Sequence, residues 1–279
     1  MEDAASMTRT MIAAVAAGAL LLLGTTMVRA QGVSYGSETP ITPPSDRSGW
    51  TLGLGIALVP DYIGSNDYEL VPIPYLNWQG GQRYFNLTAL TAKGNVLDSE
   101  FIEFGPRLQV RRSRDDVHND RVDDMKSTDT AVELGAFIAA KYQRWRGEVW
   151  FSQDVADAYN GQLAGFEGSY TWPINESWVL KPALSTMYAS GKFMETYFGV
   201  DSRDAQRSGL RPYDANAGFE NVGGDLTLSY TGWEQWGISG FVSYDRLLND
   251  AEDSPVTQVG SANQFFVGAV VTYRFDSGS

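Results

Sequence analysis

Cysteine is absent from the 279-residue sequence, and histidine occurs only once. The absence of cysteine excludes disulfide bonds, thiolate metal ligands, a cysteine nucleophile and a cysteine-linked lipid anchor. Basic residues are also few, because 21 lysines and arginines stand against 34 aspartates and glutamates. A nucleic-acid partner is disfavoured by this balance, since phosphate neutralisation requires an excess of lysine and arginine. From Trp50 onwards the chain also lacks any long amphipathic helical pattern.

The N-terminal segment is predicted to be a cleaved signal peptide, residues 1–30. Its apolar core, residues 11–23, suits a signal sequence and is too short to span a bilayer as a helix. A membrane-anchoring helix is the weaker alternative, and Met7 fits the signal pattern better than Met1 as the start. Residues 31–48 are rich in Gly, Ser, Thr and Pro and are predicted to form a flexible periplasmic leader. One folded unit, residues 49–275, and a short tail, residues 276–279, complete the predicted organisation.

A repeat of period two dominates the folded unit. In residues 50–58, Trp, Leu and Ile side chains alternate with Thr, Gly and Ala, and similar runs recur up to Phe275. Charged residues in the regular runs fall on the second phase, while the apolar phase tends to end in aromatic residues. A tilted transmembrane strand needs about 9–11 residues, and a Lys or Arg facing lipid at midplane costs about 2–4 kcal/mol. The pattern therefore predicts an all-β protein, an antiparallel transmembrane β-barrel of the outer-membrane type.

Connection lengths predict the topology of this barrel. Long connections alternate with short ones over the last two-thirds of the chain, as in barrels with short periplasmic turns and longer outer loops. About eleven runs are recognisable, and an even number is expected, so both ten and twelve strands remain open. Prolines in "PIPYL", "FGPRL" and "LKPAL" are expected to mark bulges or strand ends, because proline cannot donate to the ladder.

The second phase of the strands is predicted to line the lumen. Its charges have mixed sign, which suits either an interior filled by ion pairs or a narrow channel. The predicted lumen-facing charged residues are Arg107, Arg111, Arg146, Glu148, Glu167, Lys181 and Asp225.

The chain resembles the MltA-interacting protein (MipA/OmpV-like) family of outer-membrane proteins. The resemblance is carried by "VPDYIGSNDYELVPIPYL", "VELGAF", "TYFGVDSRDAQRSGLRPYDANAGFENVG", "YDRLLNDAEDSPV" and the closing "YRF". Together these motifs extend over almost the whole folded unit. Tyr273 and Phe275 resemble the terminal aromatic signal that the barrel-assembly machinery reads, although four residues follow Phe275.

The resemblance implies an integral protein of the Gram-negative outer membrane, in contact with lipid and lipopolysaccharide. It also implies a non-enzymatic scaffold that links a murein transglycosylase to a murein synthase; a small-solute channel and a surface adhesin are the alternatives. The family has no established catalytic set, so no catalytic residue, cofactor or metal ligand is predicted.

Two stretches are candidates for an interaction site. The longest connection carries Tyr197, Phe198, Leu210 and Tyr213, which could fold inward as a plug or outward as a binding surface. Asp61 and Tyr62 in "PDYIGS" form the other candidate, although Pro, Gly, Asp and Ser are also ordinary turn residues. His118 lies in an acidic tract and is the residue on which an enzymatic alternative depends; we predict a solvated position in an outer loop.

Overall fold

Residues 48–276 are described by the computed structural model, so the predicted signal peptide, nearly all of the leader and the last three residues lie outside them. The described chain forms one antiparallel sheet that closes on itself, because β10 pairs with both β8 and β11. Its strands are β1 (Gly49–Pro60), β2 (Tyr68–Gly80), β3 (Arg83–Thr88), β4 (Thr91–Asn95), β5 (Ile102–Arg111), β6 (Ala131–Tyr142), β7 (Trp145–Asp154), β8 (Gln162–Tyr170), β9 (Trp172–Pro173), β10 (Trp178–Ala189), β11 (Gly218–Tyr230), β12 (Trp236–Leu247) and β13 (Asn263–Asp276).

Twelve of these strands form the wall of the barrel. The two-residue β9 pairs with β10 further along the line of β8 and is not an additional wall strand. The predicted transmembrane barrel is confirmed, and twelve is the correct one of the two strand numbers. The strand that periodicity does not reveal is β4, whose five residues contain a lysine, a glycine and an asparagine and show no apolar phase.

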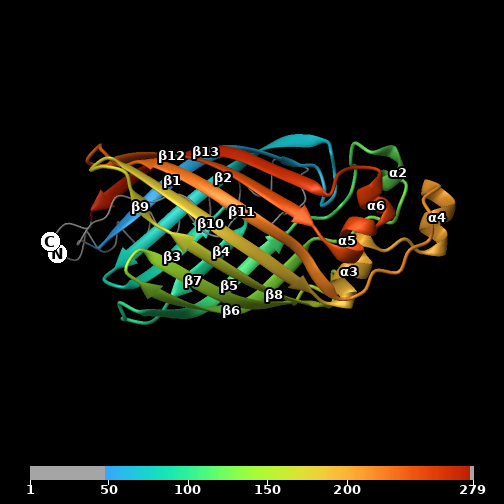
Figure 1. Cartoon of the computed structure of the whole chain (residues 1–279), viewed down its shortest axis with the longest axis horizontal. Coiled ribbons are helices and arrows are strands. Elements are labelled where there is room, and N and C mark those ends of the chain that lie inside the picture. Colours follow the sequence, from blue (N-terminus) through green and yellow to red (C-terminus); the bar gives the residue numbers. More distant parts are fainter. Residues whose placement is uncertain (1–47, 277–279) are drawn as a thin grey trace, which may run out of the picture.

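The two ends of the barrel differ (Figure 1). All helices in the described residues gather at one end, here called the capped end: α2 (Asp120–Asp123), α3 (Gly191–Phe198), α4 (Ser202–Ser208), α5 (Asn249–Asp253) and α6 (Pro255–Gln258). The opposite end, here called the turn end, carries most of the short connections, and β1 begins and β13 ends there. Among the described residues, no helix is both long and apolar enough to cross a membrane.

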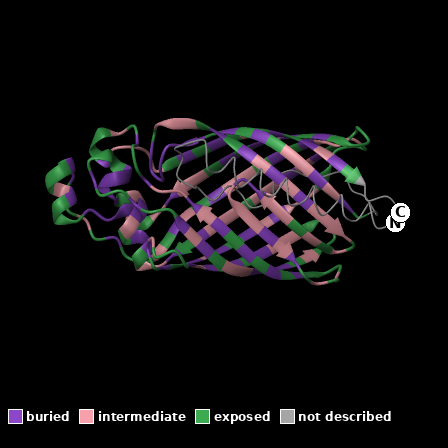
Figure 2. Cartoon of the chain, turned by 180° about the vertical axis from the view of Figure 1, so that it is seen from behind, coloured by how far each residue is buried: buried purple, intermediate pink, exposed green. Residues whose placement is uncertain are grey.

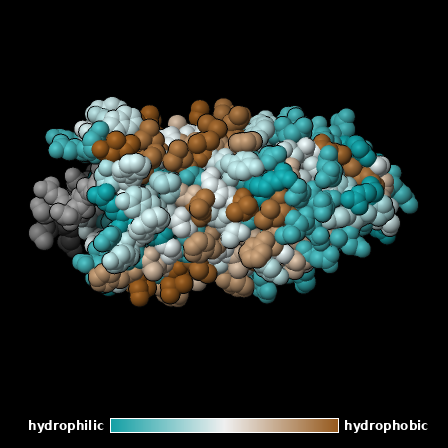
Figure 3. All heavy atoms as spheres, viewed as in Figure 1, coloured by the Kyte–Doolittle hydropathy of each residue, from teal (hydrophilic) through white to brown (hydrophobic). Residues whose placement is uncertain are grey.

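The two faces of the wall follow the predicted phases. Buried and exposed residues alternate along the strands, as the banding in Figure 2 shows. In β1, Leu54 and Ile56 are 67% and 56% exposed, whereas Thr51 and Ala57 on the other phase are buried. Figure 3 shows apolar residues on the barrel wall and mostly hydrophilic residues over the capped end. An apolar outer wall on a closed barrel is the arrangement that a bilayer requires.

Aromatic rings border this apolar wall at both ends. At the turn end, ring pairs join neighbouring strands, with centroids 4.7 Å apart for Trp145 and Tyr170 and 5.0 Å for Trp178 and Tyr230. At the capped end, the Tyr244 and Phe265 rings lie 5.0 Å apart. Such girdles mark the levels where strands meet lipid headgroups.

Prolines lie where the ladder is interrupted. Pro182 of β10 stands between Leu180, which pairs with β9, and Ala183, which pairs with β8. Proline removes a donor, so it is tolerated at such a break.

Gly135 in β6 tests how closely the wall is packed. A Cβ added there would lie 1.8 Å from the backbone oxygen of Phe151 on β7, and a backbone group cannot rotate away. We expect Gly135→Ala to destabilise the barrel by about 1–3 kcal/mol or more, measured as a lower urea midpoint after reconstitution in liposomes. Gly147→Ala is the matched control on β7, since nothing lies within 4 Å of its added Cβ. Equal midpoints for the two variants would contradict the close approach of β6 and β7.

Candidate functional site: the barrel interior and its cap

The predicted lumen-facing charges all lie on the inner face of the wall. Glu148 on β7 is fully buried and binds two cations, Lys93 Nζ at 3.0 Å and Arg146 Nη2 at 2.5 Å. Arg146 also binds Glu103, with an Nη2–Oε2 distance of 2.9 Å. Buried charges are tolerated when they are paired in this way. The pairs join β4, β5 and β7 along one side of the inner wall, and they occupy part of the lumen there.

Arg107 is held by an aromatic side chain. Its guanidinium lies 4.1 Å from the centre of the Trp150 ring, a short cation–π distance. The Trp150 ring in turn crosses Gly165 of β8, where an added Cβ would lie 2.3 Å from it. Glu167, Lys181 and Asp225 lie on the inner face of β8, β10 and β11, with Asp225 the more exposed of the three.

Arg111 connects the wall to the cap. Its Nε donates to Glu133 Oε1 at 2.9 Å, and both side chains are almost fully buried. The same guanidinium lies 5.1 Å from the Phe193 ring and 5.8 Å from the Tyr197 ring, both on α3. The wall therefore presents a paired cation to the aromatic face of this helix.

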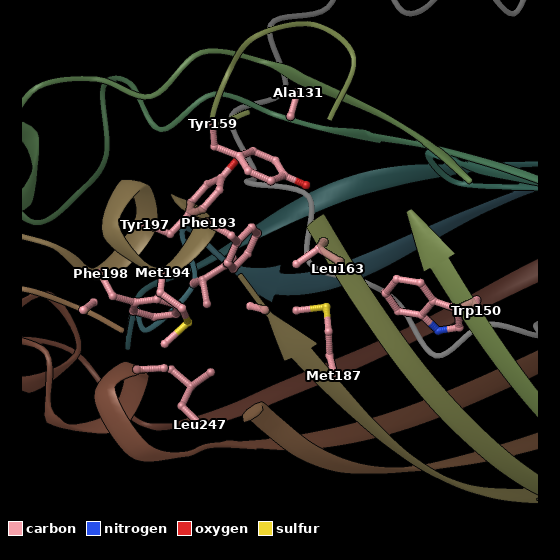
Figure 4. Close-up of a cluster of buried hydrophobic side chains, with 14 of the residues drawn as sticks. Ala131, Trp150, Tyr159, Leu163, Met187, Phe193, Met194, Tyr197, Phe198 and Leu247 are labelled. Atoms are coloured by element: carbon pink, nitrogen blue, oxygen red, sulfur yellow. The ribbon is translucent and has the colours of Figure 1, made fainter. Parts of the chain in front are cut away.

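Helix α3 is folded into the barrel mouth, and we call it the α3 plug. Its Phe193, Met194, Tyr197 and Phe198 side chains are 0–1% exposed. They join one apolar cluster with inward-facing wall residues, among them Trp150 and Met187 (Figure 4). The Phe193 ring packs edge-on against Tyr159, with centroids 5.2 Å apart. The sequence left open whether the longest connection folds inward as a plug or outward as a binding surface. In the structure, the part that forms α3 folds inward.

Two other connections and the later part of its own connection hold the C-terminal end of the α3 plug. Arg114, after β5, donates from Nη1 to the carbonyl of Tyr197 at 3.0 Å. Ser254, between α5 and α6, donates from Oγ to the carbonyl of Phe198 at 2.6 Å. The backbone N–H of Ala215 donates to Glu195 Oε2 at 3.1 Å. The last carbonyls of a helix lack partners within it, so these contacts stabilise a helix of only eight residues.

The remaining candidate interaction residues also lie inside the cap. Tyr62 and Leu210 pack in a second apolar cluster with Val122 of α2 and Val256 of α6, and Tyr62 is fully buried. The hydroxyl of Tyr213 donates to the Asp250 carbonyl at 3.2 Å. Burial raises the pKa of the Tyr62 hydroxyl far above its usual range, so it stays protonated. These residues hold the cap together and are not an exposed contact surface.

Asp61 and His118 connect two outer loops. The carboxylate of Asp61 is fully buried and accepts from the backbone N–H of His118 at 2.7 Å. His118 Nδ1 lies 3.2 Å from the same oxygen, and its side chain is about half exposed. No group of three or more His, Asp or Glu that could hold a metal occurs in residues 48–276. The histidine contact is thus a link between loops at the protein surface.

One buried carboxylate was missed by periodicity. Counted back from Val222, Glu220 falls on the lipid-facing phase, yet it is only 2% exposed. The register shifts at this point, since Met187 pairs with Asn221 and Tyr188 with Phe219, which leaves Glu220 in a bulge. A bulge turns one side chain to the other face. An isolated charge on the apolar phase is the sequence signal that could have revealed it.

Tyr273 and Phe275 lie at the turn end of β13. Their rings are 4.6 Å apart, and the Tyr273 ring is 4.9 Å from Trp236 on β12. Phe275 is 42% exposed on the outer face. β13, which carries both residues, pairs with β12 on one side and with the first strand, β1, on the other. The pairing of β13 with β1 closes the barrel.

The turn end presents short, connected turns. The backbone N–H of Thr231 donates to the Ser177 carbonyl at 2.8 Å, which links the β9–β10 and β11–β12 connections. Glu176 and Glu234 are exposed in these two connections, and Trp233 packs against Tyr230 with ring centroids 4.7 Å apart. This end is therefore an ordered surface with free acidic side chains at its rim.

Comparisons with known proteins agree on one group. The family model described as MltA-interacting protein MipA matches residues 52–275. The MltA-interacting protein of Escherichia coli (strain K12) is 24% identical over 265 residues, covering 92% of this chain and 98% of that protein. The outer membrane protein Omp26La of Vibrio anguillarum is 33% identical over 231 residues, covering 81% and 86%.

Solved structures that align with this chain include two porins. The KdgM porin aligns with a TM-score of 0.41 at 8% identity, covering 81% of this chain and 99% of that one. The NanC porin aligns with a TM-score of 0.42 at 10% identity, covering 80% and 98%.

Proposed function

Because this chain belongs to the MltA-interacting protein MipA family and lies in the outer membrane, we propose that it is a non-enzymatic scaffold for murein-remodelling enzymes. The partners proposed are a murein transglycosylase and a murein synthase. The name of the Escherichia coli relative supports an interaction of this kind. Short turns of outer-membrane barrels face the periplasm, so the turn end is the surface available to such enzymes.

The observation that carries the proposal is the α3 plug. Its four buried side chains occupy the outer mouth, and contacts from two other connections and from the later part of its own connection hold it there. A barrel closed in this way favours an interaction role over a small-solute channel. The candidate interaction residues Tyr62, Leu210 and Tyr213 make contacts within the cap. The turn end is therefore the proposed contact surface. The predicted leader, residues 31–48, is a second proposed contact and lies almost wholly outside the described residues.

Charge reversal at the turn end tests the scaffold. We expect the Glu176→Lys, Glu234→Lys double variant to capture at least fivefold less murein transglycosylase from solubilised envelopes than the unmodified protein does, because two exposed acidic side chains become basic. Affinity capture followed by quantitative mass spectrometry gives the measurement. The matched control is Asp129→Lys, Asp214→Lys, the same charge change on exposed residues of the capped end. Recovery of no murein enzyme with the unmodified protein would overturn the proposal.

A further inference from the structure

Three inward-facing side chains on β10, β11 and β12 are in contact with solvent, whereas those of β5 and β8 are all buried. The three are Ser185 of β10, Asp225 of β11 and Asp245 of β12, and each is partly exposed. The register brings them together, because Gly223 of β11 pairs with Ser185 on one side and with Asp245 on the other. Together with the nearby Glu220, the two aspartates form a surface that we call the acidic wall.

The centre of the acidic wall is Gly223, whose missing side chain leaves space for oxygen atoms. A Cβ added to Gly223 would lie 1.8 Å from Oδ1 of Asp245 and 3.2 Å from Oγ of Ser185. The Asp245 carboxylate therefore lies over the backbone of β11. Asp225 faces the same side two residues further along β11, which makes it a diagonal neighbour of Asp245, with about 7–8 Å between their Cα atoms.

Glu220 adds a third carboxylate, which is almost fully buried. The bulge in β11 turns this side chain to the inner face, where it is only 2% exposed. Its Oε2 atom has no hydrogen-bond partner within residues 48–276. Arg111 attracts Glu220 electrostatically, but its Nε donates to Glu133 of β6. A buried carboxylate is costly unless it is paired, so Glu220 indicates a cationic partner that the described residues do not provide.

The acidic wall carries more negative charge than the neighbouring strands compensate. The residues that act electrostatically on Asp245 are Asp225 and Glu220, and both repel it. Glu167 of β8 repels Asp225, and Lys181 of β10 attracts it. The inward side chains of β8, β10, β11 and β12 thus include four acids and one lysine, which leaves a formal charge of −3. Such a surface attracts cations.

We propose that the acidic wall binds an organic cation with several ammonium groups, of the linear polyamine class. A small metal ion requires oxygen ligands that converge on one point, and the described part of the chain has no group of three or more His, Asp or Glu that could hold one. The carboxylates are instead spread out, since the five residues from Glu220 to Asp225 correspond to roughly 15 Å of strand.

A linear polyamine matches this spacing. Its ammonium groups are separated by short methylene chains, so each can donate to a different carboxylate, and the Ser185 hydroxyl is a further acceptor. The site lies inside the barrel and is independent of the proposed scaffold role at the turn end.

Equilibrium dialysis with radiolabelled spermidine tests the site. The protein is refolded from urea into detergent micelles with spermidine present, so loading needs no route past the α3 plug, and heat-modifiable gel mobility confirms that each variant is folded. We expect saturable binding that the Asp225→Asn, Asp245→Asn double variant weakens roughly tenfold, because the ammonium groups lose charged acceptors. Asp129→Asn, Asp214→Asn makes the same change on exposed residues of the capped end and should leave the affinity unchanged. Non-saturable binding, or equal losses in both double variants, would overturn the proposal.

A second pair of variants keeps all three carboxylates and changes only the shape of the site. Gly223→Ala places a methyl group where Oδ1 of Asp245 lies, so this carboxylate must move. Gly224→Ala is the matched control, because its added Cβ would lie 3.4 Å from the nearest atom, Cδ2 of Leu184. We expect Gly223→Ala to weaken spermidine binding roughly fivefold and Gly224→Ala to leave it unchanged. Equal affinities in the two variants would contradict the site, and neither outcome bears on capture of murein enzymes.

Discussion

Arg111→Met should destabilise the barrel by about 3–5 kcal/mol, because it leaves the fully buried Glu133 carboxylate without its cation. The loss should appear as a lower urea midpoint for the reconstituted protein, followed by tryptophan fluorescence. The same change removes the cation that faces Phe193 and Tyr197, so the α3 plug should also become accessible to trypsin.

Two controls make the Arg111 result specific. Arg246→Met breaks the Arg246–Glu252 pair, in which both side chains are about one-third exposed, and should cost less than about 1 kcal/mol. Adding Glu133→Met to Arg111→Met removes the stranded charge and should restore most of the lost stability. If Arg111→Met and Arg246→Met shift the midpoint equally, the Arg111–Glu133 pair does not carry the stability assigned to it.

Phe193→Ala should release the α3 plug while the barrel stays folded. Deletion of a fully buried phenylalanine costs about 3–5 kcal/mol. An eight-residue helix is not stable without its packing, whereas the strands keep their ladder partners. In planar bilayers, the unmodified protein should give no stable ohmic steps, and Phe193→Ala should give them.

Thr196→Ala is the control for this result. Thr196 lies on the same helix, is only half-buried, and donates to the carbonyl of Lys192 within the helix. We expect it to stay closed and resistant to protease. Stable steps with the unmodified protein would contradict the closed barrel, and silence from Phe193→Ala would show that α3 is not what closes it.

Much of the fold was predictable from sequence, although the strand number was not. The alternation in β1, β6 and β7 is regular, and it placed their inner and outer residues correctly. The β3–β4 hairpin gave no such pattern, because its strands have six and five residues and β4 carries no apolar phase. A short hairpin exposes little surface to lipid, so its sequence needs few alternating apolar residues. For this reason β4 was not recognised as a strand.

The candidate site was less predictable than the wall. Tyr197 and Phe198 were singled out from the length of their connection, but their direction depends on Arg111, Arg114 and Ser254, which come from two other parts of the chain. Glu220 was not predicted as an inner residue, because a bulge shifts the phase of the strand by one residue.

The sequence by itself determined which side chains face lipid and which face the interior, because successive side chains of a strand point to opposite sides whatever its neighbours are. It also determined which end carries the long connections. Only the tertiary structure decided the number of strands, the inward fold of α3 and the bulge at Glu220. Each of these depends on contacts between residues far apart in the chain, which local periodicity does not encode.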